Sequence, residues 1–253
     1  MRWFLLSAGL LGALAQPGLA QDTGCKTSLG IPCHTIRGTG TQWQANSWTL
    51  SQIRRVLSTD LHAVRRDGSS VNQGEVRFQD IYGRGKGEQE GSGLYLAPEN
   101  AIVTVNSIAH TIARREPLIW HDLPYRRSRS GDTACASGIL HSGTDFVQNG
   151  TAIVAGVPVV KWYRTLGNGG FEEQALAPSL DCMALSKYQV RRNAFWLPEF
   201  INSWEATSVE FGEPASGLFR LPDGYREIED PRRAQMIRYI DQHGGRIASP
   251  PRK

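Results

Sequence analysis

Segments in which polar and apolar side chains alternate occupy most of the middle of the chain. Glu75–Tyr82 and Trp204–Phe211 alternate in this way, which is typical of a strand with one buried face. Further β-prone segments lie around them: Leu61–Arg65, Gly93–Leu96, Ala101–Val105, Ile153–Tyr163, Phe171–Leu176 and Gln189–Arg192. The series predicts a meander of antiparallel strands with one packed face and one face in water.

Turn signals separate these segments. Asp67-Gly68 is a strong hairpin signal, because both residues tolerate the positive φ that a tight turn requires. Pro98–Asn100 and Gly167–Gly170 also predict turns. Gly156 and Pro158 interrupt the apolar segment Ile153–Tyr163, and they predict a bulge or an edge strand there.

Two segments have helical spacing. Thr49–Ser58 has apolar residues at Leu50, Ile53, Val56 and Leu57, which predicts a short N-terminal helix. Near the C-terminus, Asp230-Pro231 is a helix start, the stripe Met236, Ile237 and Ile240 follows, and Gly244-Gly245 ends the helix before a loose tail.

The first twenty residues resemble a secretory signal peptide. Arg2 precedes a short apolar run through Leu14, and small residues follow, with cleavage sites after Ala15 or after Ala20. We prefer Ala20, because Pro17 ends the apolar helix just before it. The run is too short to span a bilayer comfortably. We therefore expect an exported protein, periplasmic or extracellular, without a transmembrane segment after cleavage.

Composition excludes two further classes of protein, disordered proteins and nucleic-acid-binding proteins. Of the 253 residues 40% are hydrophobic, which supports a core, so disorder is not the main state. Lys and Arg number 28 against 24 Asp and Glu, a net charge of +4 that falls to about +3 once Arg2 is removed. That charge is too small for a nucleic-acid-binding protein, which has a concentrated basic patch.

Four cysteines follow the predicted cleavage site. Export permits disulfides, and we favour the pairs Cys25–Cys33 and Cys135–Cys182 among the three possible connectivities. A metal site would favour C-x-x-C spacing, and His34 beside Cys33 is one adjacent pair only. Free thiols are the remaining alternative.

Catalytic and cofactor motifs are absent from the sequence. It has no G-x-S-x-G, no H-E-x-x-H and no phosphate loop, and Gly83–Gly87 is followed by Glu88 where a Ser or Thr would bind a metal. We expect no cofactor and no metal. His141–Asp145 holds three catalytic residue types, but triad members usually come from separate segments. A hydrolase with an unrecognised site stays open as an alternative.

One cluster of positive charge suggests a binding site for an anionic head group. Arg126, Arg127 and Arg129 lie close together, and arginine presents a planar fork to phosphate. A solvated loop is the other interpretation.

Three segments together resemble a known family: Asn149–Trp162, Leu176–Cys182, and the terminal motif Gly212–Tyr225. They resemble a group of uncharacterised exported bacterial proteins that are similar to the periplasmic carriers that sort lipoproteins to the outer membrane. The resemblance spans about residues 60–230. It implies a strongly curved antiparallel sheet, or half-barrel, closed partly by helices over an apolar concavity that suits an acyl chain.

We therefore expect a mainly β (α+β) protein with a helix at each end. Its parts are a signal peptide (1–20), a disulfide-stapled segment (21–48), one half-barrel domain (49–229), and a C-terminal helix and tail (230–253). The expected function is non-enzymatic binding of an apolar or lipid-like ligand in the cell envelope. The alternatives are the hydrolase and a protein-interaction module. The sequence predicts no oligomeric state. The expected ligand contacts are Trp162, Phe195, Trp196, Trp204 and Phe211, with Arg126, Arg127 and Arg129 for a head group.

Overall fold

The computed structural model describes residues 24–45, 54–79, 85–116, 132–136 and 145–230. The predicted signal peptide, the cluster Arg126–Arg129, His141 and the C-terminal helix beyond Asp230 lie outside these residues. Within them, no helix has the length and apolar character needed to cross a membrane.

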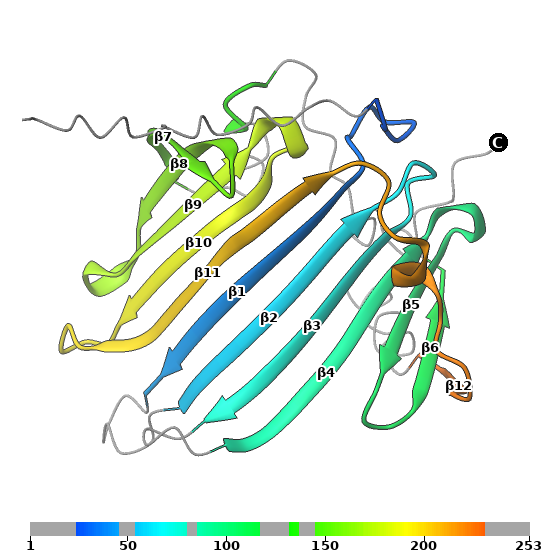
Figure 1. Cartoon of the computed structure of the whole chain (residues 1–253). Coiled ribbons are helices and arrows are strands. Elements are labelled where there is room, and N and C mark those ends of the chain that lie inside the picture. The colour runs from blue at the N-terminus through cyan, green and yellow to red at the C-terminus, as the bar shows by residue number, and fades with distance from the viewer. Residues whose placement is uncertain (1–23, 46–53, 80–84, 117–131, 137–144, 231–253) are drawn as a thin grey trace, which may run out of the picture.

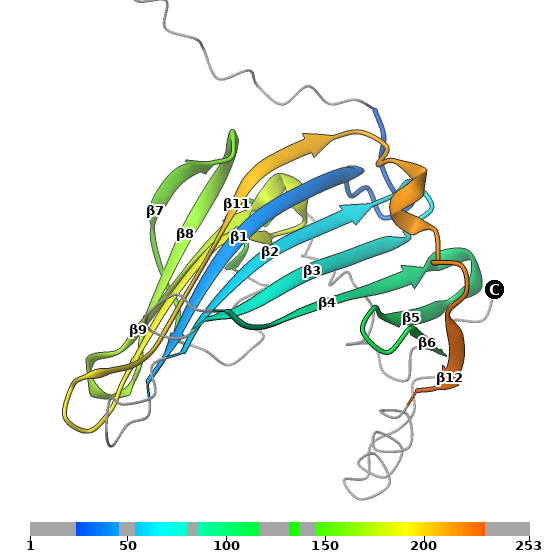
Figure 2. The ribbon, with the colours of Figure 1, turned by 60° about the horizontal axis from the view of Figure 1, so that its bottom comes forward.

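The described residues form one open, curved sheet, as the alternating pattern predicted (Figures 1 and 2). Its strands are β1 (His34–Gln44), β2 (Arg54–Val64), β3 (Ser70–Gln79), β4 (Gly85–Leu96), β5 (Ala101–Asn106), β6 (Thr111–Arg115), β7 (Val147–Val154), β8 (Val157–Thr165), β9 (Phe171–Ala177), β10 (Met183–Arg192), β11 (Pro198–Phe211) and β12 (Arg226–Glu229). Short 3-10 turns are η1 (Ala97–Glu99), η3 (Gly167–Gly169), η4 (Pro178–Leu180) and η5 (Ser216–Phe219).

The sheet consists of two meanders joined along one long pair of strands. Its order is β12-β6-β5-β4-β3-β2-β1-β11-β10-β9-β8-β7. Strands β1 to β6 lead away from the junction in one direction, and β7 to β11 return to it from the other side. All pairs are antiparallel except β12, which adds to β6 in parallel. Edge strands β7 and β12 do not pair with each other, so the sheet stays open like a half-barrel.

Most predicted turns occur where the sequence placed them. Asp67-Gly68 joins β2 to β3, with Gly68 at a φ of 87°. Pro98 and Glu99 lie in η1, which Asn100 caps with a φ of 46°, and Gly167–Gly169 forms η3. The segment Ile153–Tyr163 is not one strand, however. Ala155 and Gly156 both have positive φ, so they form a two-residue hairpin turn between β7 and β8.

The predicted N-terminal helix is wrong from Arg54 onward. Arg54–Val64 is strand β2, which pairs along its length with β1 and β3. Val56 lies opposite Gln42 and Leu57 opposite Thr41, so the two apolar side chains project to opposite faces of the sheet. Cross-strand pairing on both sides outweighs the local helical spacing. Residues 49–53 lie outside the described part.

Both predicted disulfides are confirmed. Cys25 is bonded to Cys33 and Cys135 to Cys182, and no described cysteine is free. The first pair fixes the segment before β1. The second joins residues 132–136 to the start of β10, beside a small core of Phe146, Val160, Trp162 and Leu176.

The core is concentrated at one end of the central strands. Buried residues lie at the start of β1 (His34–Ile36) and at the end of β2 (Ala63, Val64), which are the same end of an antiparallel pair. Towards the other end, at Gln42–Gln44 and Arg55–Leu57, side chains are only half-buried or exposed. The sheet therefore extends beyond its core and leaves polar surface on its strands.

The junction between the meanders depends on two glycines of β1, Gly38 and Gly40, which have no side chain. Trp204 on β11 lies over β1, and a Cβ at Gly38 would be 2.4 Å from its Cζ2. A Cβ at Gly40 would be 2.6 Å from Ser58 Oγ. The indole Nε1 of Trp204 donates to Asp60 Oδ2 on β2 at 2.9 Å. One aromatic side chain thus crosses three strands, and only glycine leaves room for it.

Gly38→Ala should destabilise the protein by about 1–3 kcal/mol, because the added methyl displaces Trp204 and its hydrogen bond to Asp60. Gly93→Ala is the matched control, since a Cβ there has no atom within 4 Å. Urea denaturation of both variants measures the difference. Equal stability of the two variants would contradict the role assigned to the junction.

Candidate functional site

Three hollows adjoin on one face of the sheet and form a trough across the strands. The first, of about 240 Å³, lies between β3–β5 and the segment that contains η5. The second, of about 390 Å³, lies over β1–β4 and shares Gln73 and Glu90 with the first. The third, of about 410 Å³, extends over β10 and β11 and shares Thr39 with the second. We refer to the three together as the trough.

The register of the sheet explains the chemistry of the trough floor. Glu90, Glu75, Thr59, Thr39 and Glu205 are successive partners across β4, β3, β2, β1 and β11. Directly paired residues project to the same face, so these side chains form one row across the sheet. The row is short and acidic, and it crosses the β1–β11 junction.

Two of these carboxylates have no internal partner. Among the described residues, no hydrogen bond or ion pair joins the side chain of Glu90 or Glu205 to the protein. Glu75 differs, because Arg77 Nε lies 2.5 Å from its Oε1 and also contacts Glu88. Glu90 and Glu75 are directly opposite like charges, an unfavourable pair in a sheet.

The β5 end of the trough has a mixed lining. Leu94, Val105 and Leu218 contribute apolar surface, and polar surface comes from Gln73, Glu90, Ser92, Ser107 and Arg220. The ring of Tyr225 closes this end while stacking on His110 at 5.1 Å between centroids. Segment 216–225 covers this end, because Phe219 is buried against the core of β2–β6 (Figure 1). The predicted packing of Leu218 and Phe219 in the terminal motif is confirmed.

The segment over the trough is fixed to the β2–β3 turn through Glu213. Its carboxylate accepts hydrogen bonds from the backbone N–H of Arg66 at 3.1 Å and from Arg65 Nε at 3.4 Å. Cys25 Sγ lies 3.1 Å from Glu213 Oε2. Cys25, Cys33 and Glu213 are the only described cluster of three metal-type ligands, and both sulfurs are in a disulfide. They therefore do not form a metal site in this oxidised state.

Three of the aromatic residues predicted to bind a ligand pack within the protein. Trp162 is buried, and its Nε1 donates to the carbonyl of Ala134 at 3.0 Å. Trp204 lies over the junction, and Phe211 packs against the core of β7–β11. Trp162 pairs with Gln174, Gln174 with Lys187, and Lys187 with Trp204, and directly paired residues project to the same face. Trp162 and Trp204 therefore share one face of the sheet, which is the face opposite to the trough.

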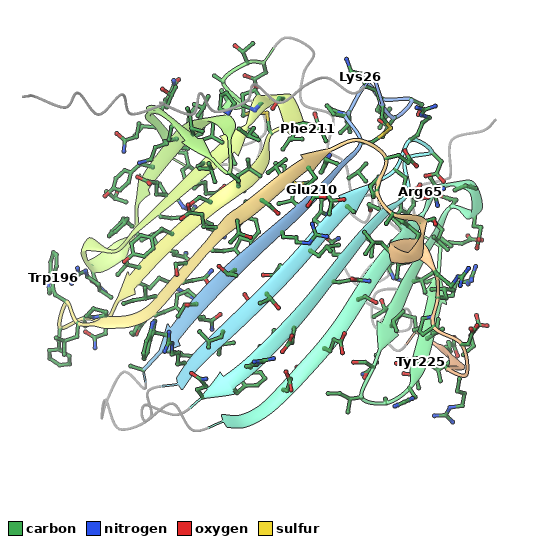
Figure 3. All side chains as sticks on the ribbon, viewed as in Figure 1. Lys26, Arg65, Trp196, Glu210, Phe211 and Tyr225 are labelled. Carbon is green, nitrogen blue, oxygen red and sulfur yellow. A yellow bond between two sulfur atoms is a disulfide. The ribbon has the colours of Figure 1, made fainter. Side chains whose placement is uncertain are left out.

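Phe195 and Trp196 are placed apart from the other three. They lie at the exposed tip of the β10–β11 hairpin, and Figure 3 shows Trp196 far from Phe211. The structure thus does not bring the five aromatic side chains together. Of the hydrolase candidates, His141 is outside the described residues and Asp145 is exposed.

Sequence reasoning missed a pair of histidines, of which His34 is buried and His62 half-buried. His34 and His62 have ring centroids 5.5 Å apart at the core end of β1 and β2. His34 Nδ1 is 2.7 Å from the carbonyl of Pro32, and His62 Nδ1 is 2.6 Å from Asn72 Oδ1. Both Nε2 atoms are buried without a hydrogen-bond partner in the described structure. Burial lowers the pKa of both, that of His34 to about 4, so the neutral forms are favoured.

A buried carboxylate on the face opposite to the trough is fully paired. Glu172 is 2% exposed and is bound by Arg164 at 2.5 Å, Gln174 at 2.7 Å and Lys187 at 3.3 Å. Burial alone would raise its pKa, but the hydrogen bonds and the nearby positive charges outweigh burial and keep the pKa below 4.5. The group is satisfied, so we assign it a structural role.

Comparisons with known proteins give distant likenesses only. No family model and no curated protein matches the chain. A chain of the Pseudomonas aeruginosa MucA/MucB complex is 15% identical with a TM-score of 0.39, over 77% of this chain and 58% of that one. An uncharacterised conserved protein from Thermus thermophilus is 8% identical with a TM-score of 0.33, over 77% and 90%.

A further likeness is to a β-barrel-like protein of a domain of unknown function from Brucella abortus. It is 7% identical with a TM-score of 0.24, over 72% of this chain and 99% of that one. This chain spans less than two thirds of the MucB chains that it matches. At these scores we draw no conclusion about a ligand or partner from any of them.

The histidine pair predicts a loss of stability in weak acid. His34 is neutral in the folded protein down to a pKa of about 4 but takes a proton near pH 6.5 once unfolded. The unfolded state therefore binds more protons, and the free energy of unfolding should fall by about 2 kcal/mol between pH 7 and 5. Urea denaturation at the two pH values measures this change.

The control separates the histidine pair from other titrating groups. His34→Asn keeps a donor near Pro32 and should remove much of the pH dependence. His110→Asn changes an exposed histidine at a φ of 49°, a conformation that asparagine tolerates, and should leave the dependence in place. An unaltered pH dependence in His34→Asn would refute the assignment.

Proposed function

We propose that this is an exported, non-enzymatic protein that binds an amphipathic ligand along the trough. The apolar part of the ligand lies under segment 216–225, against Leu94, Val105 and Leu218. A cationic or hydrogen-bond-donating head group lies over Glu90 and Glu75. The role is a ligand-binding or interaction module in the cell envelope.

The observation that supports this proposal most strongly is the unpaired Glu90 carboxylate beside the Glu75 carboxylate. Like charges directly opposite each other across two strands destabilise a sheet. Arg77 already pairs with Glu75, so a bound cation would act chiefly on Glu90, with which it would form charge-assisted hydrogen bonds. Because Glu90 lines both the first and the second hollow, a head group there leaves the apolar side chains Leu94, Val105 and Leu218 of the first hollow for a hydrocarbon chain.

The size and lining of the trough are compatible with a small amphiphile. Ligand sites usually have volumes of about 300–1,000 Å³ and combine an apolar lining with a few polar groups. The first two hollows together fall in that range, and they combine the apolar side chains of Leu94, Val105 and Leu218 with charged groups at Glu90 and Glu75. This differs in one respect from the sequence-based expectation, because the acidic floor favours a cationic head group over a fatty acid.

Export is supported by two independent features. The N-terminal segment has the pattern of a signal peptide, and both cysteine pairs are oxidised. Structural disulfides persist in the periplasm or outside the cell, and are rare in the cytosol. The ligand contacts expected from the sequence at Trp162, Phe195, Trp196, Trp204, Phe211 and the cluster Arg126–Arg129 are not part of this proposal, since the trough lies on the other face from Trp162 and Trp204.

The proposal is tested with a fluorescent long-chain alkylamine and a fatty acid of the same length. Wild-type protein should bind the amine more tightly than the acid. Ser92→Trp fills the first hollow and should weaken amine binding by about tenfold or more. Glu90→Gln should weaken it about three- to fivefold, because the carboxylate is exposed.

Matched variants control for bulk and charge. Thr104→Trp adds the same ring to an exposed position of β5 outside the trough, and Glu116→Gln removes an exposed carboxylate elsewhere. Both should bind as wild type does. Equal binding by Ser92→Trp and Thr104→Trp, or absence of amine binding by folded wild-type protein, would reject the proposal.

A further inference from the structure

The β10–β11 hairpin ends in a contiguous exposed apolar tip. The side chains of Phe195, Trp196 and Leu197 are 71%, 64% and 46% exposed. Large apolar side chains that are exposed singly are common, but three in succession at the end of a projecting hairpin are not. Figure 3 places Trp196 at the outer edge of the molecule, away from the core end of the strands.

The tip is held in one conformation by its own hydrogen bonds. Asn193 Oδ1 accepts from the backbone N–H of Phe195 at 2.9 Å and of Leu197 at 3.1 Å. The carbonyl of Asn193 accepts from Trp196 N–H at 2.9 Å, and Arg192 Nη1 donates to the carbonyl of Trp196 at 2.8 Å. The apolar side chains are therefore presented at a fixed position.

Trp196 occupies an unusual backbone conformation for so large a residue. Its φ is 63°, in the left-handed region that favours glycine or asparagine. Its ring packs against the β8–β9 turn, where a Cβ at Gly169 would be 2.5 Å from Cζ3. A tryptophan at this position costs local stability although most of the ring remains in water, which points to a role outside the folded chain.

Two arginines and one glutamate flank the tip. From Gln189 to Phe200 the chain contains Arg191, Arg192 and Glu199, a net charge of +1. Behind the tip, the guanidinium of Arg191 lies 4.5 Å from the ring centre of Phe200, and that of Arg55 lies 5.1 Å from Trp43. Aromatic and arginine side chains thus occupy the same end of the sheet, opposite to the core.

We infer that the Phe195–Leu197 tip inserts into the interface of an anionic lipid bilayer, with Arg191 and Arg192 at the phosphate level. Tryptophan prefers the boundary between headgroups and acyl chains, because one part of its ring is apolar and the other donates a hydrogen bond. Arginines beside an apolar insertion are attracted to anionic lipids. This docking surface goes beyond the ligand trough, and neither depends on the other.

A bilayer fits these residues better than a protein pocket does. The tip is narrow and convex at a hairpin end, and its own residues Phe195–Leu197 carry no charge. Arg191 and Arg192 flank it against one glutamate, Glu199.

The test is co-sedimentation of the purified, oxidised protein with vesicles. Wild-type protein should bind vesicles of equimolar phosphatidylethanolamine and phosphatidylglycerol, and less well vesicles of phosphatidylcholine alone. The double variant F195S/W196N keeps the left-handed turn, because asparagine tolerates it, and should bind about tenfold or more weakly. Arg191→Gln should weaken binding to the anionic vesicles about fivefold and leave binding to neutral vesicles unchanged.

Ile153→Ser is the matched control, since Ile153 is 65% exposed on edge strand β7, remote from the tip. It should bind vesicles as wild type does. The inference is overturned if wild-type protein does not bind anionic vesicles, or if F195S/W196N binds them equally. It is also overturned if the tip variants instead abolish self-association measured by sedimentation velocity. Vesicle binding and alkylamine binding are measured separately, so failure of one leaves the other intact.

Discussion

The pairing of β1 with β11 is the interaction on which the rest of the sheet depends. These strands are distant in sequence, and among the described strand pairs theirs is the one that joins the two meanders. Gly38 and Gly40 remove the side chains that would meet Trp204, and Asp60 binds its indole from the third strand. Without this pairing, β1 and β11 would each be an unpaired edge strand of its own meander.

The same junction determines where the trough lies. Thr39 and Glu205 are direct partners across it, and the row continues through Thr59, Glu75 and Glu90. The row of side chains is aligned only when all five strands keep this register, since a shift of one residue would move every side chain to the other face. Binding chemistry and assembly of the sheet are therefore linked through one set of strand pairs.

Local patterns predicted much of this architecture. Alternation in Glu75–Tyr82 and Trp204–Phe211 identified strands, and Asp67-Gly68 identified a hairpin, because both signals depend on near neighbours. Val56 and Leu57 misled the prediction, since their helical spacing is satisfied equally well by strand pairing on both sides. Gly156 was recognised as irregular, but not as the second residue of a turn.

The site was less predictable than the fold. Which side chains share a row follows from the register of non-adjacent strands, so Glu90 could not be placed beside Glu75 and Thr59 from spacing alone. His34 and His62 were likewise too distant in sequence to be paired. The aromatic residues were selected for their size, and the structure divides them between packing (Trp162, Trp204, Phe211) and an exposed tip (Phe195, Trp196).

The central claim is that an amphipathic ligand lies along the trough, and photo-crosslinking tests it most directly. The probe is a long-chain alkylamine with a diazirine near the end of its chain, and the labelled residues are found by peptide mass spectrometry. The account predicts labels on residues at the β5 end of the trough, such as Leu94, Leu218 and Tyr225. Labels confined to the opposite face, around Trp162 and Trp204, would contradict it.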